Sequence, residues 1–408
     1  MKQLSDVIVV GGGPCGSFAA LNLARLGVDV VVFEEHEKIG VPAHCAGHLS
    51  ISGLKRLGLY PLPKKIVEGA FYGAKFHSPT GEEFSVKFSS PATCAVNRTL
   101  FDKHIATMAK DAGAKYQLNM RIESLTMKDA YVEGVKVEGK KKDEGEFSAR
   151  IVVDAEGVSS RILRQTGLAG LNPNMVVIGV HAEVKNVKDA EPDMVEVFLG
   201  KDYADGFYAW LIPKVDGKAK IGLAAKKGNP KELLQMLMRK HPAASKKLQE
   251  AKITEISFYP LTLGGPISKA YSNGFLVVGD AASQVKPTTG GGVILGMTCA
   301  AAAAEVACEA IRMKDFSSEF LSAYQRRCDE ILGFDARIML RIRRMLDAMS
   351  DKKIDEAISF CNKLGLDKSL QSVRDIDFQG RTLMQLSRSP RMLAALLYFF
   401  FLYLSANP

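Results

Sequence analysis

The stretch that decides the fold of this chain is residues 6–34, DVIVVGGGPCGSFAALNLARLGVDVVVFE. Residues 6–10 and 28–34 are short apolar runs, which are typical of buried strands. Residues 14–26 lie between them and predict a helix that ends at Gly27. Two buried strands joined by a helix indicate a parallel β–α–β unit, so we expect an α/β protein that begins with a Rossmann-like domain.

The turn between the first strand and the helix carries the pattern G-x-G-x-x-G. Its first glycine permits the tight turn, the second lets a pyrophosphate approach the backbone, and the third lets helix and strand pack closely. The helix N terminus offers free N–H groups to phosphates, and a carboxylate at the end of the second strand is placed to accept hydrogen bonds from a ribose. The residues assigned to the dinucleotide are Gly11, Gly13, Pro14, Cys15, Gly16 and Glu34.

Two later segments combine a strand end, an acid and glycines. Residues 274–280 predict a buried strand that ends at Asp280, which could bind ribityl or ribose hydroxyls. Gly290, Gly291 and Gly292 then precede a helix, so that the backbone can approach a planar ring and the helix N terminus can favour negative charge on a reduced flavin. An earlier segment, residues 153–157, contains Asp154 and Gly157 and fits either a cofactor contact or an ordinary strand–turn–helix junction.

Composition excludes several classes of protein. The 408 residues carry 54 basic and 45 acidic side chains, a net charge of +9 that suits anionic substrates, phosphates, lipid surfaces or a plain solvated face. No recognition motif accompanies this charge, so nucleic-acid binding is not expected. Seven scattered cysteines without a CxxC pair argue against a disulfide framework or a metal site and favour a reducing cytoplasm. No run reaches the roughly 20 apolar residues of a membrane span, and residues 392–404 come closest.

These motifs occur in the order found in FAD-dependent enzymes that resemble para-hydroxybenzoate hydroxylase. Arg98, within NRTLFD at residues 97–102, matches the R-x-x-F-D element whose arginine lies near the flavin pyrophosphate in that group. The resemblance covers roughly residues 1–310 and implies FAD as the cofactor. It divides the chain into a discontinuous FAD-binding domain (1–65, 91–170 and 266–315), a β-rich substrate domain (66–90 and 171–265) and a helical C-terminal region (316–408).

Two further segments narrow the resemblance to geranylgeranyl reductases. Residues 42–47, PAHCAG, resemble the P-x-x-C-x-G segment of that family, and residues 208–214, YAWLIPK, resemble its Y-x-W-x-F-P-K motif with Ile212 in place of phenylalanine. Flavin-dependent halogenases carry an overlapping W-x-W-x-I-P element, but Tyr208 and Cys45 favour the reductases. The resemblance implies saturation of C=C bonds in geranylgeranyl chains of archaeal-type ether phospholipids, for membrane lipid biosynthesis, or of geranylgeranyl diphosphate. A flavin monooxygenase or halogenase is the alternative.

Saturating an isolated alkene requires a hydride, which reduced flavin supplies, and a proton from a general acid. Cys45 is the residue we expect beside the flavin as proton donor or as organiser of the donor, with Ala46 and Gly47 contacting the cofactor; a small buried thiol is the plainer interpretation. Tyr208 and Trp210 alternate on a strand, so they share one face. That face fits either a prenyl tunnel, which would make both residues part of the catalytic site, or the core of the sheet.

The resemblance also implies partners and a location. The substrate would be a prenylated lipid or isoprenoid, and the electron donor would be ferredoxin, a deazaflavin or NAD(P)H, since no second G-x-G-x-x-G predicts a resident nicotinamide site. The scattered cysteines argue against an iron–sulfur electron-transfer flavoprotein. We expect a cytoplasmic protein. Its apolar end, preceded by Arg388 and Arg391, either contacts the inner face of the membrane or packs internally.

Overall fold

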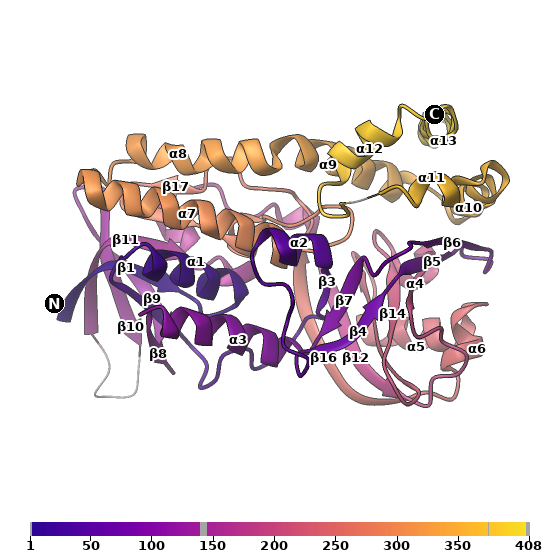
Figure 1. Ribbon diagram of the computed structural model, residues 1–408, viewed down its shortest axis with the longest axis horizontal. Helices are drawn as coiled ribbons and strands as arrows, with labels where there is room; N and C mark the ends of the chain where they lie inside the picture. The colour runs from indigo at the N-terminus through magenta and orange to yellow at the C-terminus, as the bar shows by residue number, and fades with distance from the viewer. Residues whose placement is uncertain (1, 139–144, 374, 405–408) are drawn as a thin grey trace. The chain divides into compact units, whose positions relative to one another are not determined.

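The computed structural model describes residues 2–138, 145–373 and 375–404 (Figure 1). The chain forms two compact units, each assembled from three separate segments. Unit 1 comprises Met1–Ala43, Arg98–Met175 and Thr262–Ala336. Unit 2 comprises His44–Asn97, Val176–Leu261 and Arg337–Pro408.

Unit 1 is built on a mixed sheet whose central strands are parallel. Strand β1 pairs in parallel with β2 and β11, β2 with β8, and β11 with β18, while β9 and β10 extend the sheet as an antiparallel pair. The strands are β1 (Lys2–Val10), β2 (Val30–Glu34), β8 (Lys115–Leu118), β9 (Arg121–Lys128), β10 (Tyr131–Glu138), β11 (Gly145–Asp154), β17 (Tyr271–Ser272) and β18 (Phe275–Val277). The expected α/β fold with a Rossmann-like domain is confirmed.

The longest helix of unit 1 corrects one expectation from the sequence. Helix α7 (Val293–Met313) is long and apolar enough to span a membrane, contrary to the expectation that no stretch of the sequence is. Its run of alanines is only mildly hydrophobic, so the sequence pattern does not indicate a membrane span. Because 72% of its most apolar stretch is buried, α7 is a core helix, and it packs against α1. The other helices are α1 (Pro14–Arg25), α3 (Arg98–Asp111) and α8 (Ser318–Cys328).

Unit 2 contains a seven-stranded sheet in the order β16-β12-β15-β14-β13-β5-β6 and a three-stranded sheet in the order β3-β7-β4. The strands of the larger sheet are β5 (Gly73–His77), β6 (Glu83–Lys87), β12 (Val176–Lys185), β13 (Met194–Phe198), β14 (Ala209–Pro213), β15 (Lys218–Ala225) and β16 (Lys252–Thr262). Those of the smaller sheet are β3 (His48–Ser50), β4 (Val67–Phe71) and β7 (Thr93–Val96). The expected β-rich character of this part of the chain is therefore present.

The helices of unit 2 cover parts of this sheet and form the C-terminal end of the chain. They are α2 (Ile51–Arg56), α4 (Lys201–Ala204), α5 (Pro230–Lys240), α6 (Ala244–Leu248), α9 (Phe334–Ala348), α10 (Asp351–Leu364), α11 (Leu366–Leu370), α12 (Gln379–Leu386) and α13 (Pro390–Leu404). Helices α5 and α6 are separate, because Pro242 follows α5 and cannot continue its hydrogen bonding.

The compact units differ from the expected domain boundaries. Residues 44–65, 91–97 and 337–408 belong to unit 2, and residues 171–175, 262–265 and 316–336 belong to unit 1. For the residues of unit 2 the reason is packing: β7 pairs with β3 and β4, and helices α10, α11 and α13 share a core with β6.

Candidate active site

The glycine turn of unit 1 has the geometry that its spacing predicts. Gly11 has φ +95°, and a Cβ on it would lie 2.5 Å from the carbonyl oxygen of Ala155. A Cβ on Gly16 would lie 1.9 Å from the carbonyl oxygen of Gly11, so neither position accepts a side chain. Gly13 differs, because it caps α1 with φ −65° and a Cβ on it would meet nothing within 4 Å. The space over the helix N terminus is therefore open at Gly13 and fits a phosphate group.

Glu34 fixes this turn from the end of β2. Its Oε2 accepts a hydrogen bond from the Gly12 backbone N–H at 2.7 Å, and its Oε1 accepts one from the His36 N–H at 3.0 Å and contacts the His36 ring at 2.5 Å. The sequence placed this carboxylate at the adenosine ribose. The two oxygens of a carboxylate offer about four acceptor sites, so Glu34 can support the turn and accept a ribose hydroxyl together.

Four side chains of unit 1 form a charged group near the start of α1. Arg98, the first residue of α3, donates to both oxygens of Asp102 at 3.1 and 3.0 Å. The surrounding protein raises the pKa of Asp280, although the side chain retains access to solvent, and the Arg98 guanidinium acts in the opposite direction. Burial, then the Asp280 charge, raises the pKa of the Cys15 thiol, which is therefore protonated at neutral pH. This group provides one cation and two carboxyl groups for polar parts of a dinucleotide.

The glycine-rich segment before α7 lies against Asp280. A Cβ on Gly292, which caps α7, would lie 2.6 Å from Asp280 Oδ1, and a Cβ on Gly291 would lie 2.7 Å from the Lys286 side chain. Gly290 adopts φ +70°, a conformation that favours glycine. Asp280 and the three glycines are thus brought together at the N terminus of α7, as their order in the sequence predicts.

The surroundings of the Asp154 carboxyl group indicate that it binds a ligand or carries a proton. It ends β11, is fully buried, and accepts a hydrogen bond from Glu156 N–H at 3.0 Å through Oδ1. Its Oδ2 is buried and has no hydrogen-bond partner among the described residues. Burial, followed by the Glu156 charge, raises the pKa of Asp154 well above its usual range. Gly157 follows with φ +75° and open space where a Cβ would lie.

The remaining predicted residues belong to unit 2. Cys45 is half-buried, and its Sγ accepts a hydrogen bond from the Gly47 N–H at 3.4 Å. Tyr208 stacks on Phe207 with ring centroids 4.3 Å apart, and burial raises its pKa, with the Arg343 charge opposing and the Cys45 charge adding to this effect. Cys45 and Tyr208 therefore lie within electrostatic reach of each other inside unit 2.

Trp210 packs beside Tyr208, as their shared strand face predicts. The two rings meet edge to face with centroids 6.0 Å apart. Trp210 also packs against a small apolar cluster that includes Phe71 and Ala46, and its Nε1 is buried without a partner among the described residues. A Cβ on Gly222 would lie 2.4 Å from the indole, so the glycine on the neighbouring strand makes room for the ring. Trp210 thus connects the segment that contains Cys45 (residues 44–47, the Cys45 segment) to the seven-stranded sheet.

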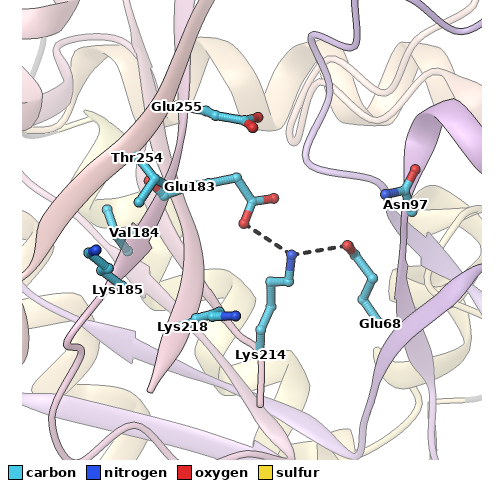
Figure 2. A pocket seen from close by; sticks show the side chains of 9 residues that line it. All are labelled: Glu68, Asn97, Glu183, Val184, Lys185, Lys214, Lys218, Thr254 and Glu255. Atoms are coloured by element: carbon cyan, nitrogen blue, oxygen red, sulfur yellow. Dashed lines mark hydrogen bonds and ion pairs between the residues drawn. The ribbon is translucent and has the colours of Figure 1, made fainter. Parts of the chain in front are cut away.

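The sequence did not single out a network of charges beneath the Cys45 segment. Lys214 Nζ lies 3.0 Å from Glu68 Oε1 and 3.1 Å from Glu183 Oε2 (Figure 2). Lys220 Nζ lies 2.5 Å from Glu68 Oε2. Although burial opposes the change, these ammonium groups lower the pKa of Glu68. A pocket of about 360 Å³ adjoins the network, with Asn97 and Glu255 also in its lining. The only signal in the sequence is a lysine inside an otherwise apolar strand, KAKIGLAA.

His181 predicts a pH dependence of stability. Burial, followed by the Lys220 charge, lowers its pKa from 6.5 to about 4, so the folded protein keeps it neutral while the unfolded chain protonates it below pH 6.5. The unfolded state therefore binds more protons between pH 6.5 and 4, and stability falls as the pH falls through that window. From pH 7 to pH 5 we expect His181 by itself to account for a loss of about 2 kcal/mol.

Urea unfolding at the two pH values measures this loss, and His181→Gln removes this contribution. His241, whose pKa is also lowered to about 4 by burial, contributes a similar amount and keeps a residual slope in the variant. An unchanged slope in His181→Gln would contradict the assignment.

The family of this chain follows from comparison with known proteins. Residues 4–332 match the model of the FAD binding domain family. Because the match covers most of the chain, this protein belongs to that family and is an FAD-dependent oxidoreductase. The open space at Gly13 and the unpartnered Asp154 oxygen in unit 1 fit this cofactor.

Curated relatives define the family more narrowly. Digeranylgeranylglycerophospholipid reductase 2 of Methanopyrus kandleri is 34% identical over 358 residues, which cover 86% of this chain and 88% of the relative. The digeranylgeranylglycerophospholipid reductase of Methanocaldococcus jannaschii is 34% identical over 87% of this chain and 90% of its own length. The chain therefore belongs to the digeranylgeranylglycerophospholipid reductase family, as the resemblance of residues 42–47 and 208–214 predicts.

Solved structures share the fold. The geranylgeranyl bacteriochlorophyll reductase-like protein of Thermoplasma acidophilum superposes with a TM-score of 0.86 at 23% identity, covering 97% of this chain and 99% of that one. The flavin-dependent brominase Bmp2 superposes with a TM-score of 0.70 at 18% identity, covering 94% and 93%. The halogenase fold is thus the same in outline.

Proposed function

We propose that this protein saturates C=C bonds of geranylgeranyl chains, with archaeal-type ether phospholipids as the leading substrate class and geranylgeranyl diphosphate as the second. The observation that carries the proposal is 34% identity over most of the chain to digeranylgeranylglycerophospholipid reductases, against fold likeness alone to halogenases. The grouping of Cys45, Tyr208 and Trp210 within unit 2 supports it.

We infer that unit 1 holds FAD through the residues that the sequence assigns. The pyrophosphate would lie over Gly13 and the N terminus of α1, where backbone N–H groups are available, with Arg98 as the nearby cation. Glu34 would hold the adenosine ribose, Asp280 the ribityl hydroxyls, and the Gly290–Gly292 segment the ring. Asp154 and Gly157 would complete this set within unit 1. When bound and reduced by the external electron donor, FAD would supply the hydride.

Unit 2 would supply the proton and the apolar wall. The Cys45 thiol is our proton donor, because it is half-buried and the adjacent Ala46 packs on an apolar cluster together with Trp210. The raised pKa of Tyr208 keeps its hydroxyl neutral, so it can hold or pass a proton without carrying charge next to an alkene. Trp210 would contact the prenyl chain. The electron donor would be external, either ferredoxin, a deazaflavin or NAD(P)H.

We also propose that helix α13 rests on the membrane that contains the substrate, which gives a cytoplasmic protein in peripheral contact with the inner face. One side of α13 packs in unit 2, where the rings of Phe360 and Tyr398 stack with centroids 3.8 Å apart. Its opposite side exposes four large apolar side chains at i, i+4, i+7 and i+8: Leu393, Leu397, Phe400 and Phe401. Exposed arginines at 388 and 391 precede this face and suit anionic lipid headgroups.

Vesicle binding tests the α13 face. The Phe401→Glu variant should bind vesicles of anionic phospholipid on the order of tenfold more weakly, since burying one large apolar side chain stabilises binding by about 1.5–3 kcal/mol. Flotation measures the bound fraction. Val215→Glu, in the exposed turn between β14 and β15, introduces the same charge elsewhere and should bind as the unmodified protein does. Equal vesicle binding by both variants would show that α13 does not contact the membrane.

The reductase and the halogenase differ in what reoxidises the flavin. In stopped-flow experiments without oxygen, chemically reduced holoenzyme mixed with unsaturated ether lipid should regain the absorbance of oxidised flavin. A monooxygenase or halogenase would show this recovery only after oxygen is admitted. Recovery that depends on oxygen and ignores the lipid would overturn the proposed function and favour the alternative.

A further inference from the structure

Lys220 is a lysine in the core of unit 2. It lies on β15, is 3% exposed, and is flanked by Ala219 and Ile221, which are fully buried. An ammonium group has three N–H donors, and three acceptors surround this one. They are the carbonyl oxygens of Ala46 at 2.9 Å and Val96 at 3.0 Å, and Glu68 Oε2 at 2.5 Å. The buried charge is thus compensated by two hydrogen bonds to backbone carbonyls and by one ion pair with a carboxylate.

The two carbonyls belong to segments far apart in the sequence. Ala46 follows Cys45 directly, and Val96 ends β7, two residues before Arg98. The Val96 N–H also donates to the Gly47 carbonyl at 2.9 Å, so the two segments are bonded to each other next to Lys220. The chain passes between the units after residues 43 and 97, so both carbonyls lie close in sequence to these passages.

Stability alone does not explain a charged residue here. Well-packed apolar side chains often replace buried ion pairs without loss of stability. An apolar side chain at position 220 would fill the space but would donate nothing to the two carbonyls. Glu68 would keep a cationic partner in Lys214, at 3.0 Å. What Lys220 adds is a hydrogen-bond donor to the Ala46 carbonyl beside Cys45 and to the Val96 carbonyl at the end of β7.

We propose that Lys220 is a positioning residue that fixes the backbone of residues 44–47 and thereby holds the Cys45 thiol in one orientation. The inference rests on the proposed function for the role of Cys45, but its geometric content stands apart from that role. Without the ammonium group the Ala46 carbonyl loses its hydrogen bond to Lys220, and the Cys45 segment then unfolds locally more often.

The Lys220→Met holoenzyme tests this inference through the reactivity of Cys45. We expect iodoacetamide to alkylate Cys45 about tenfold faster than in the unmodified protein, measured by mass spectrometry of the peptide, since a hydrogen bond to a charged donor is lost. Cys15, the other half-buried cysteine, should keep its rate. Turnover should fall by a similar factor at nearly constant KM, with unchanged FAD content.

Lys218→Met is the matched control, because Lys218 is an exposed lysine on the same strand. It should leave Cys45 alkylation and turnover unchanged. A rate of Cys45 alkylation in Lys220→Met equal to that of the unmodified protein would overturn the inference. If the methionine variant does not fold, Lys220→Arg decides the question. It keeps a cation for Glu68, but its planar fork cannot replace the ammonium geometry, so faster alkylation is expected and an unchanged rate would overturn the inference.

The same measurements separate this inference from the proposed function. Faster alkylation in Lys220→Met, in a protein that reduces no prenyl lipid, would support the positioning role and reject the reductase proposal. Unchanged alkylation in Lys220→Met, in a protein that does reduce the lipid, would reject the positioning role and support the reductase proposal.

Discussion

The Gly13→Ala variant should fold normally and lose FAD. Its backbone at φ −65° suits alanine, and the added Cβ would meet no protein atom within 4 Å, so the fold has no reason to change. If the pyrophosphate lies over this residue, the methyl group occupies its place. Overpacking of this kind costs about 3 kcal/mol, which corresponds to a roughly hundredfold weaker affinity for FAD. Fluorescence titration of the apoprotein with FAD measures the affinity, and thermal melting without FAD reports the fold.

Gly170→Ala is the matched control for this variant. Gly170 is exposed, has no positive φ, and would also place its Cβ in open space. Its variant should therefore keep both the melting temperature and the FAD affinity. If the Gly13→Ala protein binds FAD as tightly as this control, the pyrophosphate does not lie over the glycine turn.

The Cys45→Ala variant should retain FAD and lose most of its turnover. A positioned general acid contributes about a hundredfold or more to such a reaction, and alanine leaves no proton donor at this position. We expect turnover of the unsaturated lipid to fall by about that factor while the flavin spectrum is unchanged. Turnover is measured with chemically reduced holoenzyme without oxygen.

Cys361→Ala controls for the loss of a thiol, since Cys361 lies in the apolar core that α10 shares with β6. It should change stability slightly and turnover little. If Cys45→Ala turns over as fast as Cys361→Ala, Cys45 is not the proton donor, and Tyr208 becomes the residue to replace next.

The sequence predicts unit 1 well because its signals are local. The spacing of Gly11, Gly13 and Gly16 determines a turn between a strand and a helix that follow at once, and the structure confirms that fold. The grouping of Asp280 with the glycines before α7 also follows from chain order, since a short loop joins them. Parallel strands with their carboxyl ends at one edge bring such loops together without further information.

Unit 2 was harder to predict because its contacts are long-range. Ala46 packs with β7 and β14, and no local pattern reveals that the chain leaves the dinucleotide-binding unit after Ala43. Lys220 reads as one lysine in a strand, and only the fold brings the Ala46 and Val96 carbonyls to it. In the C-terminal helices the apolar run was visible, but the division of α13 into a packed and an exposed face depends on tertiary structure.

The most direct test of the account is the mass of the product. Chemically reduced holoenzyme, incubated without oxygen with an ether phospholipid that carries geranylgeranyl chains, should yield lipid heavier by about two mass units for every double bond reduced. The Gly13→Ala protein should give none of this product. An unchanged lipid mass, under conditions in which the flavin is demonstrably reduced, would contradict the assignment of this protein as a geranylgeranyl reductase.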